Sequence, residues 1–233
     1  MKKKSIAMIT ARGGSKRIPR KNVKEFLGKP ILLYSIEAAL EAGIFDEVMV
    51  STDDEEIAAL AKEAGAKVPF MRSESTANDY ATTTDVVYEV LSEYRKRGEE
   101  FEYCCCIYPT APFVTAECLK EAMGMLIEKK ADSLVPVVRF GFPPQRAVVI
   151  QNNRMEFKWP ENKFTRSQDL EPFYHDCGQF YCLKTDSFLT QKSLVMEDTV
   201  AFIREESKVQ DIDTMEDWKM AELKYRMMIE QED

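Results

Sequence analysis

Two groups of charged side chains have the types and spacing for phosphate chemistry. Six cations and no acid lie within residues 12–24, namely Arg12, Lys16, Arg17, Arg20, Lys21 and Lys24. Two adjacent glycines in the same stretch, Gly13 and Gly14, would let backbone N–H groups approach an anion closely. Several cations in so short a stretch suit a polyphosphate better than a single phosphate. A solvated basic loop, or one that attracts RNA, is the alternative interpretation.

The second group is the acidic pair in the stretch DIDT near the end of the chain. Asp211 and Asp213 are two residues apart on an expected strand, so their side chains would leave the same face. Paired carboxylates repel each other unless a cation lies between them, and Mg²⁺ typically takes one or two protein carboxylates together with phosphate oxygens and water. Thr214 and Asp217 resemble a helix N-cap and its partner, so the pair could instead be acids at a helix start. Together with the basic stretch, the pair indicates nucleotidyl transfer with Mg²⁺ or Mn²⁺ as cofactor.

The sequence argues against several common nucleotide-binding, metal and catalytic sites. The basic stretch contains neither the G-x-x-x-x-G-K-[ST] pattern of a P-loop nor the G-x-G-x-x-G pattern of a dinucleotide fold. His175 is the single histidine, so a zinc site or a Ser-His-Asp triad would have to rest on it alone. The six cysteines, three of them consecutive at residues 104–106, are expected to be buried, reduced thiols.

Bulk composition narrows the partners. The formal net charge of −8 and the pI of about 5.0 argue against a general nucleic-acid binder. No apolar run approaches the ~20 residues that a membrane-spanning helix needs. The apolar segment Ile6 to Ile9 is also shorter than the ~7–15 residues of a signal peptide core. We therefore expect a cytoplasmic protein with no nucleic-acid and no membrane partner.

Apolar patterning predicts alternating strands and helices. The expected strands are residues 5–10, 47–52, 103–109, 133–138, 178–183 and 209–213. The expected helices are residues 30–43, 53–66, 81–98, 115–130 and 214–228. Short strands alternating with helices predict an α/β fold with a mostly parallel, doubly wound, Rossmann-like sheet. Ligands of such sheets lie at the carboxyl ends of the strands, where the basic stretch follows the first strand.

One segment breaks this alternation. Residues 140–174 are rich in Pro, Asn, Gln and aromatic side chains and carry few helix signals. We expect a single domain over residues 1–233 with an inserted hairpin arm at about 140–177. Because the segment is long for a surface loop of a compact domain, it is expected to pack on a second subunit.

A family resemblance rests on five stretches in this order: ITARGGSKRIPRKN, VSTDDEEIAALAKEAGA, MRSESTANDYATTTDVV, YPTAPF and DIDT. Together they resemble the cytidylyltransferases that activate nonulosonic acids, the CMP-sialic acid synthetase family, from about residue 5 to 225. Within that family, TRSQDL followed by YHDCGQFY is most similar to the pseudaminic acid enzymes. The resemblance implies a nucleotidyltransferase fold, transfer of CMP from CTP to the sugar's anomeric hydroxyl with release of pyrophosphate, and a homodimer whose arm reaches the neighbouring active site.

The resemblance also implies roles for individual residues. Nucleotide binding would fall to Arg12, Gly13, Ser15, Lys16, Lys21, Asn22, Arg72, Asp79, Ala81, Thr82, Thr83, Pro109 and Thr110. Metal binding would fall to Asp211 and Asp213, and the catalytic groups would be Lys21, Arg12, Asp213 and Asp211. The sugar would contact Tyr108, Arg166, Tyr174, His175 and Gln179, with Arg166 or Arg146 as the partner of its carboxylate. Tyr108 stands where the sialic acid enzymes usually have glutamine, so a sugar role transferred to that position is open. Arg17 and Lys24 are expected on the solvent side.

Other functions fit parts of the same pattern. The acceptor could be N-acetylneuraminic acid, legionaminic acid, an eight-carbon octulosonic acid or a sugar 1-phosphate. A non-catalytic nucleotide-binding protein and an RNA-binding module are the further alternatives, although aromatic residues do not interleave with the basic stretch as RNA binding would favour.

Overall fold

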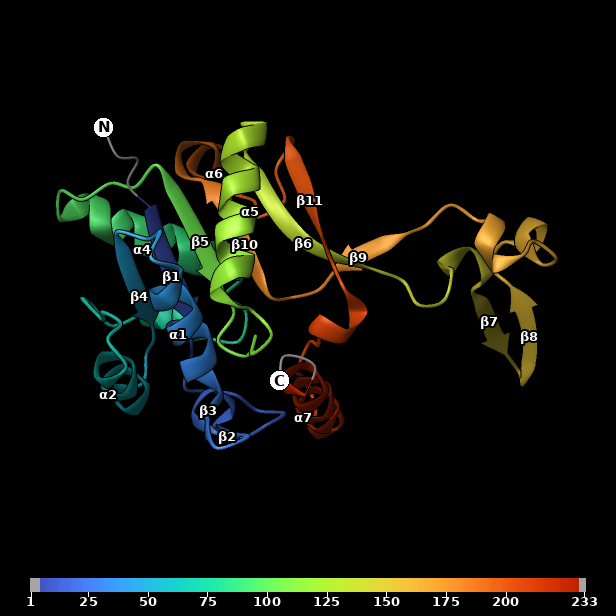
Figure 1. The fold of residues 1–233 in the computed structure, drawn as a ribbon, viewed down its shortest axis with the longest axis horizontal. Coiled ribbons are helices and arrows are strands. Elements are labelled where there is room, and N and C mark those ends of the chain that lie inside the picture. Colours follow the sequence, from blue (N-terminus) through green and yellow to red (C-terminus); the bar gives the residue numbers. More distant parts are fainter. Residues whose placement is uncertain (1–4, 231–233) are drawn as a thin grey trace.

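The computed structural model describes residues 5–230 and places a seven-stranded sheet at its centre, in the order β11-β6-β10-β5-β1-β4 with β9 added beside β6 (Figure 1). The strands of this sheet are β1 (Ser5–Thr10), β4 (Glu47–Ser51), β5 (Tyr103–Ile107), β6 (Ser133–Arg139), β9 (Tyr174–Asp176), β10 (Phe180–Lys184) and β11 (Thr199–Arg204). Strand β1 pairs in parallel with β4 and β5, and β11 pairs in parallel with β6. Strand β10 runs antiparallel to both β5 and β6. The sheet is therefore mostly parallel, as predicted.

Both faces of the sheet are covered. On β1, Ala7 and Ile9 pack into one apolar cluster, whereas Ile6 and Met8 pack into another. Helices α1, α2 and α5 supply side chains to the first cluster, and α4 and α6 supply the second. The helices are α1 (Ile31–Ala42), α2 (Glu55–Glu63), α3 (Glu74–Ala77), α4 (Thr83–Lys96), α5 (Ala116–Lys129), α6 (Thr185–Gln191) and α7 (Met215–Ile229). Figure 1 shows α1 and α5 in front of the sheet, and the doubly wound prediction is confirmed.

The last predicted strand is wrong. Residues 209–213 pair with no strand, and the strand beside β6 at one edge of the sheet is β11, which was not predicted. Side chains take the place of a neighbouring strand here: Lys224 Nζ donates to the Val209 carbonyl at 2.9 Å, and Lys21 Nζ donates to the Ile212 carbonyl at 2.6 Å. Asp211 and Asp213 still flank Ile212, which is fully buried.

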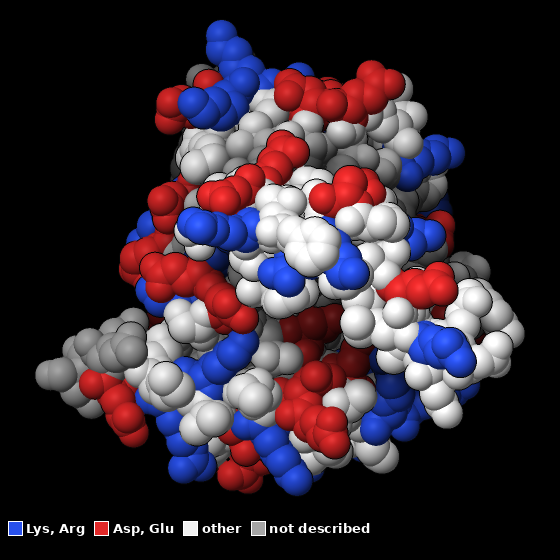
Figure 2. Space-filling view, turned by 90° about the vertical axis from the view of Figure 1, so that its right-hand side faces the viewer, with Lys and Arg blue, Asp and Glu red and all other residues white. Residues whose placement is uncertain are grey.

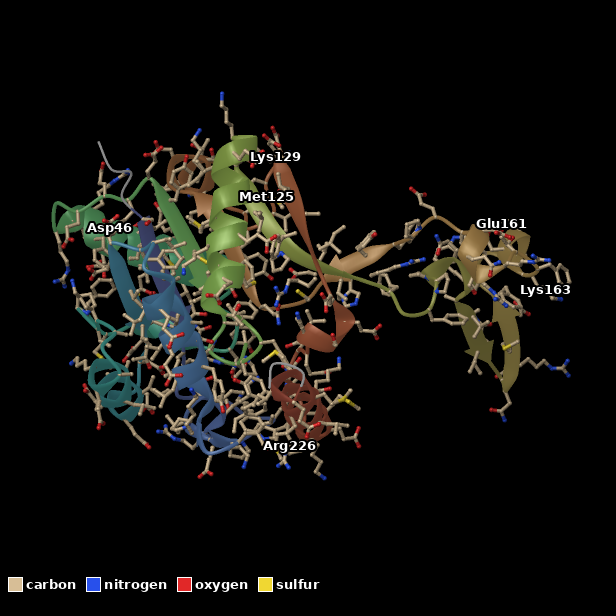
Figure 3. All side chains as sticks on the ribbon, viewed as in Figure 1. Asp46, Met125, Lys129, Glu161, Lys163 and Arg226 are labelled. Atoms are coloured by element: carbon tan, nitrogen blue, oxygen red, sulfur yellow. The ribbon has the colours of Figure 1, made fainter. Side chains whose placement is uncertain are left out.

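The arm leaves the sheet after β6 and returns through β9. Its only regular strands among the described residues are β7 (Val148–Gln151) and β8 (Arg154–Phe157), which pair as an antiparallel hairpin. Three short 3₁₀ turns, at Pro144–Arg146, Pro160–Asn162 and Ser167–Asp169, complete it. Figure 1 shows the hairpin standing away from the sheet, and in Figure 3 the labelled Glu161 and Lys163 lie at the far end. A two-stranded hairpin is only marginally stable in water by itself. We therefore expect another protein surface to pack against this arm.

A third apolar cluster fixes the basic loop to the last helix. Phe26, in the small β2–β3 ladder (Glu25–Phe26 with Lys29–Pro30), packs edge-on against Tyr34, Trp218 and Tyr225 with ring centroids 5.5–5.7 Å apart. Ile18 from the basic stretch and Ile212 from the acidic stretch are buried in the same cluster. Residues far apart in the sequence are thus held side by side.

Two short 3₁₀ turns, Lys21–Val23 and Glu206–Lys208, adjoin these stretches. All six cysteines are buried and unpaired, as expected. No helix among residues 5–230 has the length and apolar character to cross a membrane.

Candidate active site

The basic loop and the acidic pair meet in one cavity at the carboxyl ends of β1 and β5. This first cavity has a volume of about 430 Å³. Of the predicted nucleotide and metal residues, it is lined by Arg12, Ser15, Lys16, Lys21, Asn22, Arg72, Asp79, Ala81, Thr82, Thr83, Pro109, Thr110, Asp211 and Asp213. The structure therefore brings together side chains from opposite ends of the chain, at the edge where open α/β sheets bind ligands.

The six cations of the basic stretch divide into two sets. Four of them line the first cavity: Arg12, Lys16, Arg17 and Lys21. Arg20 instead pairs with Asp54 and Glu56, and its guanidinium holds the pKa of Asp54 below the ordinary value. Lys24 lies over the Trp218 ring, 5.6 Å from its centroid. Two of the cations thus fasten the loop, and four are available to a ligand.

The conformation of the loop is set by close backbone contacts. The Gly13 amide donates to Asp53 Oδ1 at 2.9 Å, and a Cβ at Gly13 would lie 2.7 Å from Asp54 Oδ2. Only glycine fits so close to the start of α2. Gly13 is accordingly beside the first cavity without lining it. Ser15 Oγ accepts from the Lys21 amide at 3.1 Å, which closes the loop on itself.

Lys21 lies where the loop and the acidic pair touch. Its Nζ is 2.6 Å from the Ile212 carbonyl and 3.8 Å from Asp213 Oδ1. Burial lowers the pKa of Lys21, and the charges of Asp213 and Asp211 oppose that shift. A bound polyanion would oppose it further, because a nearby negative charge favours the charged ammonium.

The acidic pair points away from the protein interior because Ile212 between them is fully buried. Burial by surrounding protein raises the pKa of Asp211, and the charge of Asp213 adds to the effect. Arg17 Nη2 lies 2.8 Å from Asp213 Oδ1, and the Arg17 side chain is 68% exposed, so Arg17 lies on the solvent side as expected and also lines the first cavity. The two carboxylates carry like charges and repel each other. A hard divalent cation bound by both would relieve this repulsion.

The loop before α4 forms the opposite wall. Asp79 pairs with Arg12 at 2.9 Å and with Lys16, and the hydrogen bond from Lys16 is the main reason that the pKa of Asp79 is lowered. Asn78 Oδ1 accepts from the amides of Tyr80 and Ala81, and Thr82 caps α4 in a capping box with Asp85. These local bonds shape the stretch 78–83 into a rim around the cavity.

Arg72 lies at the base of the first cavity. It is buried, and its guanidinium donates to Ser51 Oγ at 3.0 Å and to the Ser51 carbonyl at 2.6 Å, at the end of β4. Burial lowers the pKa of Arg72 from a very high ordinary value. A buried arginine held at the strand end gives a fixed positive charge under the ligand site.

A second cavity of about 330 Å³ adjoins the first and shares Asp211 with it. The neck of the arm, the 3₁₀ turn Glu206–Lys208 and α7 line it, through Val138, Arg139, Gly141, His175, Asp176, Cys177, Glu206, Val209, Gln210, Asp211 and Lys224. Figure 2 looks onto the side from which the arm projects and shows a hollow with acidic side chains at its floor. Asp211 is therefore positioned to act on ligands in either cavity.

The predicted sugar residues are only partly brought together. Tyr108 lines the first cavity and His175 lines the second. Arg166 lies in the arm, directly before the 3₁₀ turn Ser167–Asp169, and lines neither cavity of its own chain. Tyr174 is exposed on β9 and also lines neither.

Gln179 is the clearest correction among the sugar residues. It is fully buried, and its Nε2 donates to the Lys208 carbonyl at 3.0 Å. The backbone carbonyl of Gln179 accepts a hydrogen bond from the Tyr108 backbone amide at 2.8 Å. Gln179 therefore supports the wall between β10 and the stretch before Asp211 rather than facing a ligand.

Some lining residues were missed by the sequence reading. The first cavity also includes Thr10, Arg17, Ile18, Thr76, Asn78 and Val86, and the second includes Asp176 and Lys224. Asn78 lies inside a stretch that was already singled out, so its turn-forming type was an available signal. Asp176 likewise lies inside the stretch YHDCGQFY that was already singled out, whereas Lys224 carried no such signal, because only folding places it beside Asp211.

Comparisons with known proteins agree with this geometry. The family model described as Cytidylyltransferase matches residues 6–231. A pseudaminic acid cytidylyltransferase of Campylobacter jejuni is 40% identical over 96% of this chain and 97% of its own length. A CMP-N,N'-diacetyllegionaminic acid synthase of Legionella pneumophila is 32% identical over 93% of this chain and 94% of its own.

The fold has solved counterparts as well. A CMP:2-keto-3-deoxy-manno-octonic acid synthetase complexed with CTP superposes with a TM-score of 0.68, at 18% identity, over 97% of this chain and 99% of that one. At that identity the likeness concerns the fold alone. The family match spans both the basic loop and the acidic pair, and full-length relatives exceed 30% identity. The chain therefore belongs to the cytidylyltransferase family.

Proposed function

We propose that this cytidylyltransferase transfers CMP from CTP to the anomeric hydroxyl of pseudaminic acid and releases pyrophosphate. One observation carries the proposal: four loop cations and two carboxylates line one cavity, and the carboxylate of Asp211 also lines the cavity next to it. The Campylobacter jejuni relative, whose name specifies pseudaminic acid, supports this acceptor.

CTP would occupy the first cavity. Lys21, Arg12 and Lys16 would bind the triphosphate, with Lys21 nearest the α-phosphate. The rim at residues 79–83, together with Arg72, Pro109 and Thr110, would hold the ribose and cytosine. The ion pairs of Arg12 and Lys16 with Asp79 are exposed and therefore weak, so phosphate oxygens can replace the carboxylate.

Asp211 and Asp213 would hold Mg²⁺ or Mn²⁺, because their oxygens are the ligands that such hard cations prefer. A metal ion bound there would neutralise phosphate charge and help orient the leaving pyrophosphate. Arg17, which contacts Asp213, would have to give way or turn toward the phosphates.

The acceptor would occupy the second cavity, next to His175. Its anomeric oxygen forms a bond to the α-phosphorus of CTP while the bond from that phosphorus to the pyrophosphate oxygen breaks. Asp211, which lines both cavities, is placed to take the proton of the hydroxyl. Lys21 and Arg12 stabilise the charge that develops on the phosphoryl oxygens.

The arm would complete the site in a homodimer. Phe142, Ile150, Met155 and Phe164 on the arm are 61–88% exposed, which favours a covering partner. A partner would also bring Arg166 or Arg146 to the acceptor carboxylate, since Arg166 lines neither cavity of its own chain. The six unpaired cysteines support a reducing compartment, which for this enzyme would be the cytoplasm.

The acidic pair is tested by changing each carboxylate to an amide. Asp211→Asn or Asp213→Asn should lower kcat by roughly a hundredfold or more, because charge stabilisation of the transferring phosphoryl group is lost. Turnover is measured as pyrophosphate release across a Mg²⁺ titration, with urea unfolding as the check on folding. Asp186→Asn, which changes an exposed residue of α6, is the matched control and should behave as wild type. Near-normal turnover in both site variants would leave the pair with no metal role.

The basic loop is tested by comparing its two sets of cations. Lys21→Ala should lower kcat/KM by roughly a hundredfold or more, since it removes a partly buried charge beside the α-phosphate. Lys24→Ala removes a cation that contacts Trp218 outside the cavity, so its kcat/KM should stay within about threefold of wild type. Equal losses in the two variants would indicate a diffuse electrostatic patch instead of a shaped binding loop.

The dimer is tested in solution. Light scattering at micromolar concentration should give twice the 26.8 kDa mass of the chain. Phe164→Asp, which puts a charge on the most exposed aromatic residue of the arm, should shift the protein toward monomer and reduce turnover together. A fully active monomeric wild type would rule out the arm's role in a neighbouring site.

The choice of acceptor tests the function itself. Pseudaminic acid has a second acylamino group and a terminal methyl where N-acetylneuraminic acid has a hydroxylated tail. The preference for pseudaminic acid in kcat/KM should be at least about tenfold to a hundredfold, because an unpartnered buried hydroxyl costs ~1–3 kcal/mol. Pyrophosphate release is measured with CTP and pseudaminic, N-acetylneuraminic, legionaminic and octulosonic acids and a sugar 1-phosphate. Equal or better use of another acid would overturn the pseudaminic assignment alone.

A further inference from the structure

Asp176 is a carboxylate of the second cavity, and the proposed function assigns it no role. It ends β9 and lines the same cavity as Asp211 and His175. Its Oδ2 accepts from the Tyr181 hydroxyl at 2.6 Å, and its Oδ1 accepts from the Gly178 amide at 2.8 Å. A carboxylate oxygen has two lone-pair sites, so each oxygen of Asp176 can still accept one more hydrogen bond.

Tyr181 holds this carboxylate from inside the protein. It lies on β10 and is only 6% exposed. Burial is the main cause that raises the pKa of Tyr181, with contributions from Tyr108 and Asp176, so the hydroxyl remains a proton donor. Its ring meets the Tyr108 ring edge-on, with centroids 5.7 Å apart, and the Tyr108 hydroxyl is 3.1 Å from Thr83 Oγ1. Thr83, Tyr108, Tyr181 and Asp176 therefore form one continuous wall from the first cavity to the second.

The turn after Asp176 brings it beside the acidic pair. Gly178 has a left-handed backbone with φ of 60°, and a Cβ there would lie 3.6 Å from the Asp211 carboxyl carbon. The segment 176–178 thus packs against Asp211. Asp211 borders both cavities, whereas Asp176 borders only the second, so the two carboxylates face different parts of a ligand that spans them.

We propose that Asp176 binds the acceptor by accepting hydrogen bonds from its hydroxyl and acylamino N–H groups, and that Tyr181 is the positioning residue that orients Asp176. The inference rests on the proposed function, because it assumes a nonulosonic acid in the second cavity. Asp176 repels the acceptor's own carboxylate and attracts its donors, which selects one orientation of the sugar. Donors to a charged acceptor make the stronger hydrogen bonds, and a site that binds them discriminates against analogues without them.

The test compares Asp176→Asn with Asp186→Asn, a matched acid-to-amide change at an exposed residue of α6 that lines neither cavity. Asparagine keeps the size of Asp176 and an oxygen for the Gly178 amide, but it loses the charge. Asp176→Asn should raise KM for pseudaminic acid by about tenfold or more, while kcat changes less than about threefold. CTP affinity, measured by calorimetry, should be unchanged. Tyr181→Phe should raise the same KM by a smaller factor, and Asp186→Asn should not raise it.

The possible results distinguish a failure of the role given to Asp176 from a failure of the proposed function. An acceptor KM within about twofold of wild type in Asp176→Asn overturns the inference and leaves the proposed function standing. Loss of CTP affinity and of kcat together in Asp176→Asn also overturns it, because the residue would then be structural. If wild type binds CTP and turns over no nonulosonic acid, the proposed function fails and the inference fails with it.

Discussion

The contact between Lys21 and the backbone carbonyl of Ile212 is the constraint on which the site depends. It joins the loop after the first strand to the stretch before the last helix, at 2.6 Å. An ammonium group is costly to bury without partners. The carbonyl, together with Asp213 at 3.8 Å, supplies those partners. Ile18 and Ile212 on either side are buried in the cluster around Phe26 and Trp218, so apolar packing and the polar contact reinforce each other.

The cations of the first cavity pair with carboxylates that a bound polyphosphate can replace. In this structure Arg12 and Lys16 contact Asp79, and Arg17 contacts Asp213. These pairs are largely exposed, so each contributes little to the stability of the fold. They keep the cations near the cavity, where a polyphosphate can compete for them. Arg20 and Lys24, which fasten the loop to α2 and α7, do not take part in this exchange. Binding therefore need not disturb the anchors of the loop.

Asp211 and Asp176, two carboxylates of the second cavity, differ in their partners and in the cavities that they border. Asp211 is held next to Asp213 and borders both cavities, whereas Asp176 is bound by Tyr181 and Gly178 and borders one. Gln179, expected at the sugar, instead ties β10 to the chain before Asp211 through the Lys208 carbonyl. The wall between the cavities is therefore built from buried side chains of the sheet, which holds it more rigidly than a loop would.

The sequence alone determined the class of fold, the basic loop and the acidic pair through local signals, and the family resemblance supplied the other residues predicted at the first cavity. Apolar alternation marked β1, β4, β5 and β6, and Thr214 with Asp217 marked the start of α7, where the capping box is present. Tertiary structure decided what depends on neighbours. Only the sheet order made β10 antiparallel and left 209–213 unpaired, because strand pairing is a long-range choice. Likewise, Lys224 became a cavity residue only when α7 packed beside Asp211, since proximity between distant segments leaves no local pattern.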